Sequence, residues 1–191
     1  MHRAYRGALT PVRHRGVYRD GMAEIDLTSE EEREILTWER FGVATRELAS
    51  EIAADGFRPD MVLAIARGGL TVAGALAYAL AVKNCFAMNV EFYTSVDERL
   101  DVPVVLPPML DKLDLAGMRV LIADDVADTG KTLELVRKEI AEHVAEARTA
   151  VLYHKPRSII TPEYVWAHTE RWINFPWSSQ APVVESANTD A

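Results

Sequence analysis

The amino-acid sequence predicts an α/β protein with a doubly wound, mostly parallel central sheet flanked by helices. Residues 61–66 and 120–123 are uninterrupted apolar runs, and each is followed by small or polar residues and then by a helical pattern. Such runs are typical of parallel strands buried on both faces, and their alternation with helices is typical of α/β sheets. Ligands bind such sheets where strands end and helices begin.

The composition fits one globular domain. The chain has 191 residues, of which 49% are apolar and 26% charged, and this length favours a single substantial core. The net charge of −8 argues against a general nucleic-acid or membrane binder, and no apolar run reaches membrane-spanning length. Cys85 is the only cysteine, so we expect a cytoplasmic location and a role for Cys85 as a core filler.

Three segments are expected along the chain. Residues 1–28 contain five arginines without apolar periodicity and favour a disordered arm, although a basic arm that docks on the acidic body or on a partner stays open. Residues 29–177 form the folded domain. Residues 178–191 are polar and predict a loose tail.

The first helix of this domain is expected to begin near Ser29. Ser29 followed by Glu32 forms a capping-box pattern, and apolar residues at helical spacing continue to Ile52. Gly56 provides a stop. Trp38 lies in the apolar row, so we expect it in the core.

The most informative stretch is residues 120–132. Its apolar strand ends in the adjacent carboxylates Asp124 and Asp125, and a turn of small and polar residues then leads into a helix. Such a turn points free backbone N–H groups at an anion, typically a phosphate, while paired carboxylates suit hydroxyls or a divalent metal. The stretch therefore predicts a sugar-phosphate site. The alternative is an ordinary strand–helix turn with solvated aspartates.

A nucleotide loop of the Walker type is excluded by one residue. Residues 130–132 look like the end of that loop, but Asp125 stands where its first glycine belongs. A carboxylate at that position would repel the phosphates.

A second strand–glycine–helix unit follows residues 61–66. Arg67, Gly68 and Gly69 lie at its turn, and a doubly wound sheet would place this turn near the first one. The glycines free backbone N–H groups, and the arginine adds a fork of donors that suits a diphosphate.

The stretch 120–132 resembles the motif of type I phosphoribosyltransferases that binds 5-phosphoribosyl-1-diphosphate (PRPP). The resemblance implies that Asp124 and Asp125 hold the ribose hydroxyls and a Mg²⁺ ion, and that the turn after them holds the 5-phosphate. It also implies a diphosphate loop with a non-proline cis peptide, which we place at Ala66–Arg67. The PRPP-binding residues implied are Arg67, Gly68, Gly69, Asp124, Asp125, Ala127, Asp128, Thr129, Gly130, Lys131 and Thr132.

The base-binding residues are implied by a closer similarity to bacterial xanthine–guanine and hypoxanthine phosphoribosyltransferases. Asp128 matches an acid that guides a proton on the imidazole part of the purine, and Lys155 matches a donor to the 6-oxo oxygen. Residues 155–177 match a small C-terminal hood over the active site. In that hood Trp172 would stack on the purine, and the carbonyl of Ile173 would face its exocyclic group.

Residues 94–114 have no clear period, and the family has a mobile loop here that closes over the reacting centre. A surface hairpin is the alternative for part of this segment. Trp177 follows Pro176 and is expected to be structural.

These assignments predict transfer of a phosphoribosyl group from PRPP to guanine, hypoxanthine or xanthine in purine salvage. Asp124, Asp125 and Asp128 would be the catalytic residues, and Mg²⁺ the cofactor. The family implies a homodimer or homotetramer. Two alternatives stay open: a PRPP-binding regulator of the same fold with little catalysis, and a transferase for adenine or a pyrimidine.

Overall fold

The structure is a computed structural model that describes residues 33–91, 104–106 and 115–184. All of them belong to one compact unit, Glu32–Ala191. The predicted basic arm at residues 1–28 and the capping box at Ser29 lie outside the described residues. Within the described part of the chain, no helix is long and apolar enough to cross a bilayer.

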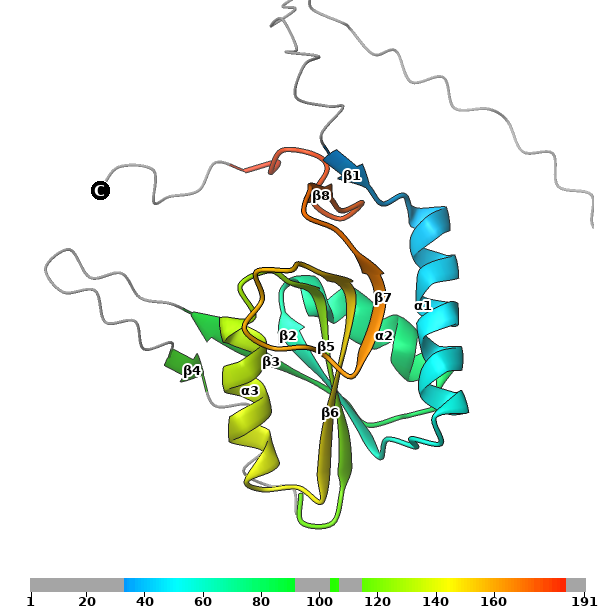
Figure 1. The fold of residues 1–191 in the computed structure, drawn as a ribbon, viewed down its shortest axis with the longest axis vertical. Helices are drawn as coiled ribbons and strands as arrows, with labels where there is room; N and C mark the ends of the chain where they lie inside the picture. Colours follow the sequence, from blue (N-terminus) through cyan, green and yellow to red (C-terminus); the bar gives the residue numbers. More distant parts are fainter. Residues whose placement is uncertain (1–32, 92–103, 107–114, 185–191) are drawn as a thin grey trace, which may run out of the picture. The chain divides into compact units, whose positions relative to one another are not determined.

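The predicted sheet is present. Six strands pair in the order β4-β3-β2-β5-β6-β7, and neighbouring strands run parallel except for the antiparallel pair of β3 and β4 (Figure 1). The strands are β2 (Met61–Ala66), β3 (Cys85–Glu91), β4 (Val104–Leu106), β5 (Arg119–Ala127), β6 (Glu146–His154) and β7 (Tyr164–His168).

Helices cover both faces of this sheet. The helices α1 (Trp38–Ala54) and α2 (Gly68–Ala79) share one buried core with Val62 and Ala64 of β2, whereas α3 (Lys131–Ala141) packs with the alternate residues of that strand. The side chains of a strand alternate between its faces, so an unbroken apolar run serves both cores. The doubly wound prediction is confirmed.

The connections define where a ligand would bind. The strands β2 and β5 are neighbours at the centre of the sheet, but α2 leads from β2 to β3 on one side, and α3 leads from β5 to β6 on the other. The chain thus turns away in opposite directions between β2 and β5, which is the switch point at which open α/β sheets bind ligands. The two predicted loops follow these two strands.

The predicted start of the first helix is wrong. Residues Arg33–Ile35 form β1, which pairs in parallel with β8 (Trp172–Asn174), and α1 begins only at Trp38. The hydroxyl of Thr37 caps the helix by accepting a hydrogen bond from the amide of Arg40 at 3.2 Å. Pairing with a distant segment therefore overrides the local helical pattern.

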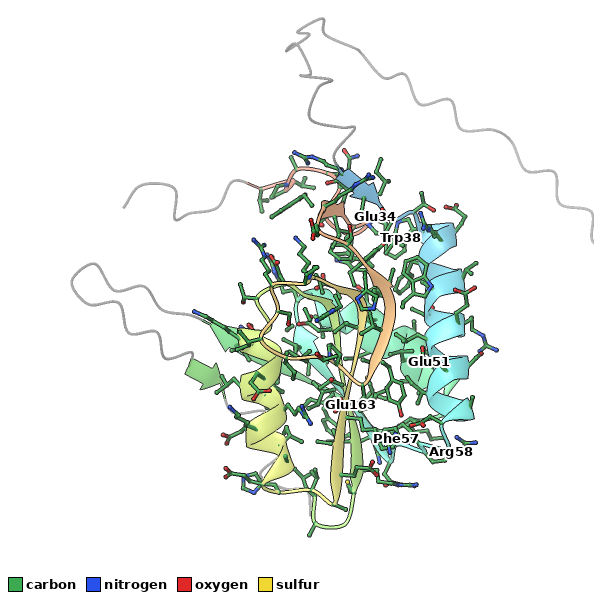
Figure 2. The ribbon with its side chains drawn as sticks, in the orientation of Figure 1. Glu34, Trp38, Glu51, Phe57, Arg58 and Glu163 are labelled. Atoms are coloured by element: carbon green, nitrogen blue, oxygen red, sulfur yellow. The ribbon has the colours of Figure 1, made fainter. Side chains whose placement is uncertain are left out.

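Two residues expected in the core lie at its rim instead. Trp38 is the first residue of α1 and is 54% exposed, although its ring contacts Phe41 and Trp177. Trp38 lies near Glu34 at one end of α1, and Phe57 and Arg58 lie at the other (Figure 2). Cys85 is exposed as the first residue of β3.

The loop predicted at residues 94–114 is described only in part. The strand β4 pairs antiparallel with β3, with Val104 opposite Glu91, as a hairpin would require. Residues 92–103 and 107–114 lie outside the described residues, so the closing loop stays a prediction.

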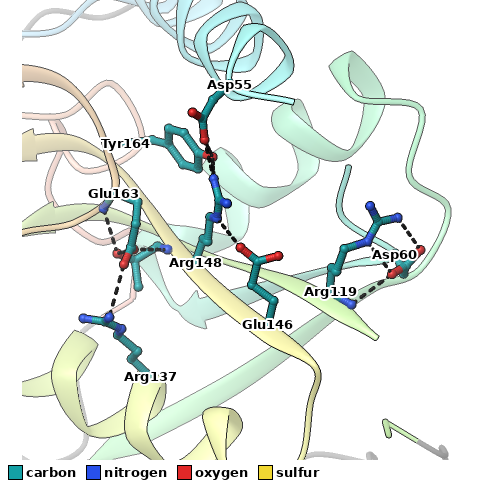
Figure 3. Close-up of polar contacts among 9 residues, drawn as sticks. Asp55, Asp60, Arg119, Arg137, Glu146, Arg148, Glu163 and Tyr164 are labelled. Atoms are coloured by element: carbon teal, nitrogen blue, oxygen red, sulfur yellow. Dashed lines mark hydrogen bonds and ion pairs between the residues drawn. The ribbon is translucent and has the colours of Figure 1, made fainter. Parts of the chain in front are cut away.

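Ion pairs and hydrogen bonds join the end of α1 to the strands β6 and β7 near the points where these strands begin (Figure 3). Arg148 contacts Asp55, the hydroxyl of Tyr164 at 2.6 Å and Glu146 at 2.6 Å. Hydrogen bonds from Tyr164 and then Arg148 lower the pKa of Asp55. None of the predicted site residues takes part, so we assign this network to the fold.

Candidate active site

The loop after β2 lies directly against the carboxylate pair. A Cβ atom on Gly68 would come within 1.9 Å of Asp125 Oδ2, and one on Gly69 would come within 2.4 Å of the carbonyl oxygen of Ala123. The backbone N–H of Gly69 donates to Asp124. A side chain at position 69 would collide with the backbone of β5, and one at position 68 would displace the Asp125 carboxylate, so close approach favours glycine at both positions.

The geometry of this loop follows the prediction. The Ala66–Arg67 peptide is cis, and Arg67 is the residue that precedes α2, with its side chain exposed. The diphosphate loop predicted at residues 67–69 therefore lies next to the acid pair at the switch point.

The two carboxylates face different surroundings. The amide of Asp125 donates to Asp124 Oδ1 at 2.9 Å, and Asp124 lies on the wall of a small hollow of about 90 Å³. Asp125 faces Gly68 and accepts a hydrogen bond from the side chain of Trp177. The hollow is lined by Asp124, Val126, Ala127, Asp128, Thr129, Gly130, Thr132 and Leu133.

The predicted end of the strand before this pair is wrong. The strand β5 continues through both carboxylates to Ala127, because its backbone stays paired with β6, with Asp124 opposite Val151 and Val126 opposite Tyr153. The carboxylates are thus held by a strand rather than a turn, which fixes their directions.

Burial raises the pKa of both acids. The pKa of Asp125 rises to about 6, against opposing hydrogen bonds that include the one from Trp177. The pKa of Asp124 lies well above its ordinary value, because burial is reinforced by the charge of Asp125. Two partly buried carboxylates with little compensating charge are suited to bind a cation or hydroxyl donors.

Without a ligand, the buried acid pair is expected to lower the free energy of unfolding of the protein. The folded pKa of Asp125 is raised from 3.8 to about 6, so its contribution to stability is complete below pH 3.8 and is lost as the pH rises through 6. Asparagine imitates the protonated acid. We therefore expect Asp125→Asn to raise the free energy of unfolding at neutral pH by up to about 3 kcal/mol, with a difference near zero in acid.

Urea unfolding at pH 7 and at about pH 4 would measure this effect. Asp55→Asn is the matched control, because the pKa of Asp55 is lowered and its loss should destabilise the protein at pH 7. A less stable Asp125→Asn protein at pH 7 would show that the carboxylate is compensated within the fold.

The turn predicted to bind the phosphate is closed by a glycine. Gly130 has a φ of +75° and precedes α3, and a Cβ atom there would meet Ser158 Oγ at 2.3 Å. The first amides of α3 lie just beyond it, at Lys131 and Thr132. A helix N-terminus reached through a left-handed glycine offers backbone N–H groups to an anion.

The predicted base-binding residues also meet. Lys155 follows β6 and is only 5% exposed, and its Nζ lies 3.6 Å from Asp128 Oδ1 and 5.5 Å from the ring centroid of Trp172. The Trp172 ring is 64% exposed, so a flat ligand could stack on it. The side chain of Ile173, next to it in β8, is buried in the core.

Arg157 is a candidate site residue that the sequence patterns did not reveal. Its Nε and Nη2 donate to Asp128 Oδ1 and Oδ2, each at 2.6 Å. The only signal was its place two residues after Lys155 in the same turn. A pairing across 29 residues is not visible in local patterns.

The acid pair fits Mg²⁺ only with help from a substrate. Among the described residues there is no group of three or more His, Cys, Asp or Glu that could hold a metal. Magnesium usually takes one or two carboxylates together with phosphate oxygens and water. Asp124 and Asp125 offer that minimal oxygen set beside the small hollow predicted for the phosphate.

A choice of site by cavity size alone would have favoured a different part of the molecule. A hollow of about 520 Å³ lies between the carboxyl ends of α1 and α2, and it includes Arg46, Lys83 and Arg119. None of the predicted site residues lines it. The glycine contacts, the paired acids and the placement of donors favour the switch point as the candidate site instead.

These features define a doubly wound α/β protein with a candidate ligand site at its central switch point. A family model described as the phosphoribosyl transferase domain matches residues 32–182, which is most of the chain. The chain therefore belongs to the phosphoribosyl transferase domain family, and this confirms the predicted family and enzyme class, a pentosyltransferase.

The chain aligns with most of the length of its named relatives. The chain is 32% identical over 161 residues to the xanthine-guanine phosphoribosyltransferase of Roseobacter denitrificans, covering 78% of this chain and 88% of that one. The enzyme of the same name from Idiomarina loihiensis is 28% identical over 153 residues, covering 78% and 89%.

Solved structures give the same picture. A purine phosphoribosyltransferase from Pyrococcus horikoshii Ot3 is similar with a TM-score of 0.69 and 36% identity, covering 81% of this chain and 99% of that one. A protein from Neisseria gonorrhoeae with bound ppGpp is similar with a TM-score of 0.66 and 26% identity, covering 76% and 89%.

Proposed function

We propose that this protein transfers the 5-phosphoribosyl group of PRPP to a 6-oxopurine (guanine, hypoxanthine or xanthine) and releases diphosphate. The observation that carries the proposal is the convergence of Asp128, buried Lys155 and the exposed Trp172 ring beside the phosphate hollow. The names of the relatives from Roseobacter and Pyrococcus support a purine as the acceptor. The reaction would return free bases to the nucleotide pool as purine salvage.

The PRPP molecule would bind across the switch point. Arg67 and the amides of Gly68 and Gly69 would hold the diphosphate, since guanidinium and free N–H groups both suit phosphate oxygens. The amides from Thr129 to Thr132, with Gly130 and Lys131 between them, would hold the 5-phosphate. Asp124 and Asp125 would accept hydrogen bonds from the ribose hydroxyls.

Mg²⁺, held by Asp124, Asp125 and the diphosphate, would supply charge neutralisation of the leaving group. The two carboxylates contribute by themselves as well. The bond from the anomeric carbon to the diphosphate breaks as the bond to the base nitrogen forms, so positive charge develops on the sugar. Negative carboxylates fixed beside the ribose stabilise that charge electrostatically.

The acceptor would lie on Trp172 with its polar edge toward the sheet. Lys155 would donate a hydrogen bond to the 6-oxo oxygen. Asp128 would accept the imidazole proton that the base loses when its nitrogen bonds to the sugar. Adenine has an amino group at the 6-position and no acceptor there for the ammonium of Lys155, which favours 6-oxopurines.

The direct test is diphosphate release from PRPP and Mg²⁺ with each of guanine, hypoxanthine, xanthine, adenine and uracil. We expect release with at least one 6-oxopurine. PRPP binding without turnover on any base would favour the regulator, and turnover on adenine or uracil alone would overturn the assigned acceptor. A homodimer or homotetramer and a cytoplasmic location stay predictions.

Lys155→Ala is expected to raise the KM for hypoxanthine about 10–100-fold, because a buried charged donor to the 6-oxo oxygen is lost. Adenine binding, measured as competitive inhibition, should change little. Lys138→Ala is a matched control, since Lys138 pairs with Glu134 on the surface of α3. Equal losses for hypoxanthine and adenine would remove Lys155 from recognition of the 6-position.

A further inference from the structure

Asp128 lies between two cations that differ in their surroundings. Arg157 is 62% exposed in its side chain and takes both carboxylate oxygens at 2.6 Å. Lys155 is buried, and its Nζ stands 3.6 Å from Oδ1. That distance is an ion pair but is longer than an N–H···O hydrogen bond. Asp128 is therefore bonded to Arg157 and only approached by Lys155.

The arrangement uses the geometry that only arginine has. Two parallel N–H donors match the two oxygens of a carboxylate and fix its plane, which a lysine ammonium cannot do. Within the described part of the chain, these two cations are the ion-pair partners of Asp128. If Arg157 were absent, Lys155 would be left to compensate a partly buried carboxylate.

The fold holds Arg157 in place through its backbone. The amide of Lys155 donates to the carbonyl of Ala127 at 3.0 Å, and the amide of Ile159 donates to the carbonyl of Thr129 at 2.9 Å. These bonds tie the segment 155–160 to the phosphate-binding turn on both sides of Arg157. The pair with Asp128 thus spans two fixed loops, unlike a mobile surface ion pair.

We propose that Arg157 is a positioning residue that holds Asp128 and thereby keeps the ammonium of Lys155 available for the 6-oxo oxygen of the base. This inference rests on the proposed function. The two cations then have separate roles, because Arg157 compensates and orients the proton acceptor while Lys155 contacts the purine. Loss of Arg157 would let Lys155 close on Asp128 and withdraw both groups from the base.

A double-mutant cycle tests this dependence. Arg157→Ala is expected to raise the KM for hypoxanthine about tenfold and leave the KM for PRPP unchanged. Arg157→Lys should restore part of the loss, since it returns charge without the fork. In a Lys155→Ala background, removal of Arg157 should change the KM for hypoxanthine by less than about twofold, because the lysine it frees is gone.

The controls separate this role from general stability. Arg46→Ala removes an exposed arginine of α1 and should leave both KM values unchanged. The proposal is overturned if the effects of the two substitutions multiply, if Arg157→Ala changes nothing, or if it raises both KM values alike. An inactive wild-type enzyme would remove the proposed function and this inference together, whereas an active one with independent substitutions would remove only the role of Arg157.

Discussion

Asp128→Asn is expected to lower turnover with hypoxanthine about 10²–10⁴-fold, while the Kd for PRPP changes less than about threefold. The amide has nearly the shape of the carboxylate but cannot accept a proton from the base. It also turns an N–H group toward the guanidinium of Arg157, so the two-bond pair at 2.6 Å is lost. The amides after Asp128 that are proposed to bind the phosphate are unaffected, because they belong to the backbone.

Steady-state kinetics and calorimetric titration with PRPP would separate the two effects. Glu51→Gln is a suitable control, since it removes one exposed carboxylate of α1 and lies outside the predicted site residues. Unchanged turnover would exclude Asp128 as the proton acceptor. A parallel loss of turnover and PRPP affinity would instead indicate that Asp128 organises the phosphate hollow that it lines.

The two candidate ligand loops could be predicted from the sequence because their signals are local. Gly68 and Gly69 follow one buried strand, and the pair Asp124–Asp125 lies on another, so each unit can be recognised without the rest of the fold. Their meeting at the switch point then follows from the topology of a doubly wound sheet. The two units can approach closely because glycines stand where they meet, and these glycines can be read directly from the sequence.

The parts that the sequence did not predict depend on distant partners. The strand β1 exists because Glu34 lies opposite Ile173 in β8, far along the chain, and a helical pattern covers the same residues. Asp residues are disfavoured in strands, so the extension of β5 through Asp124 is visible only in its pairing with β6. The contact made by Arg157 could not be predicted for the same reason, because its partner lies in another loop.

Gly69→Ala is expected to destabilise the protein by about 1–3 kcal/mol and to weaken PRPP binding more than about tenfold. The added Cβ would lie 2.4 Å from the carbonyl oxygen of Ala123 and 3.2 Å from Asp124 Cα. Both obstacles are backbone atoms of the central strand β5, so they cannot rotate away. Either the loop after β2 or the acid pair must move.

Gly74→Ala on the same helix is the matched control. A Cβ atom there would have nothing within 4 Å, so the substitution only adds helix propensity and should stabilise the protein by about 0.5–1 kcal/mol. The same change at two positions of α2 therefore has opposite signs, which urea unfolding of both variants would show. The difference between them reports mainly the close approach at Gly69, because Gly74 lies in the helix interior and has no neighbour within 4 Å of the added Cβ.

Gly68→Ala separates ligand binding from stability. Its Cβ would meet the Asp125 carboxylate at 1.9 Å, and a side chain can rotate where a backbone cannot. We expect a smaller loss of stability than for Gly69→Ala but an equal loss of PRPP affinity, since the displaced Asp125 is a proposed ligand of the ribose and the metal. If Gly68→Ala kept full PRPP affinity, the acid pair would not need its present position, and the assignment of Asp125 to the ribose would fail.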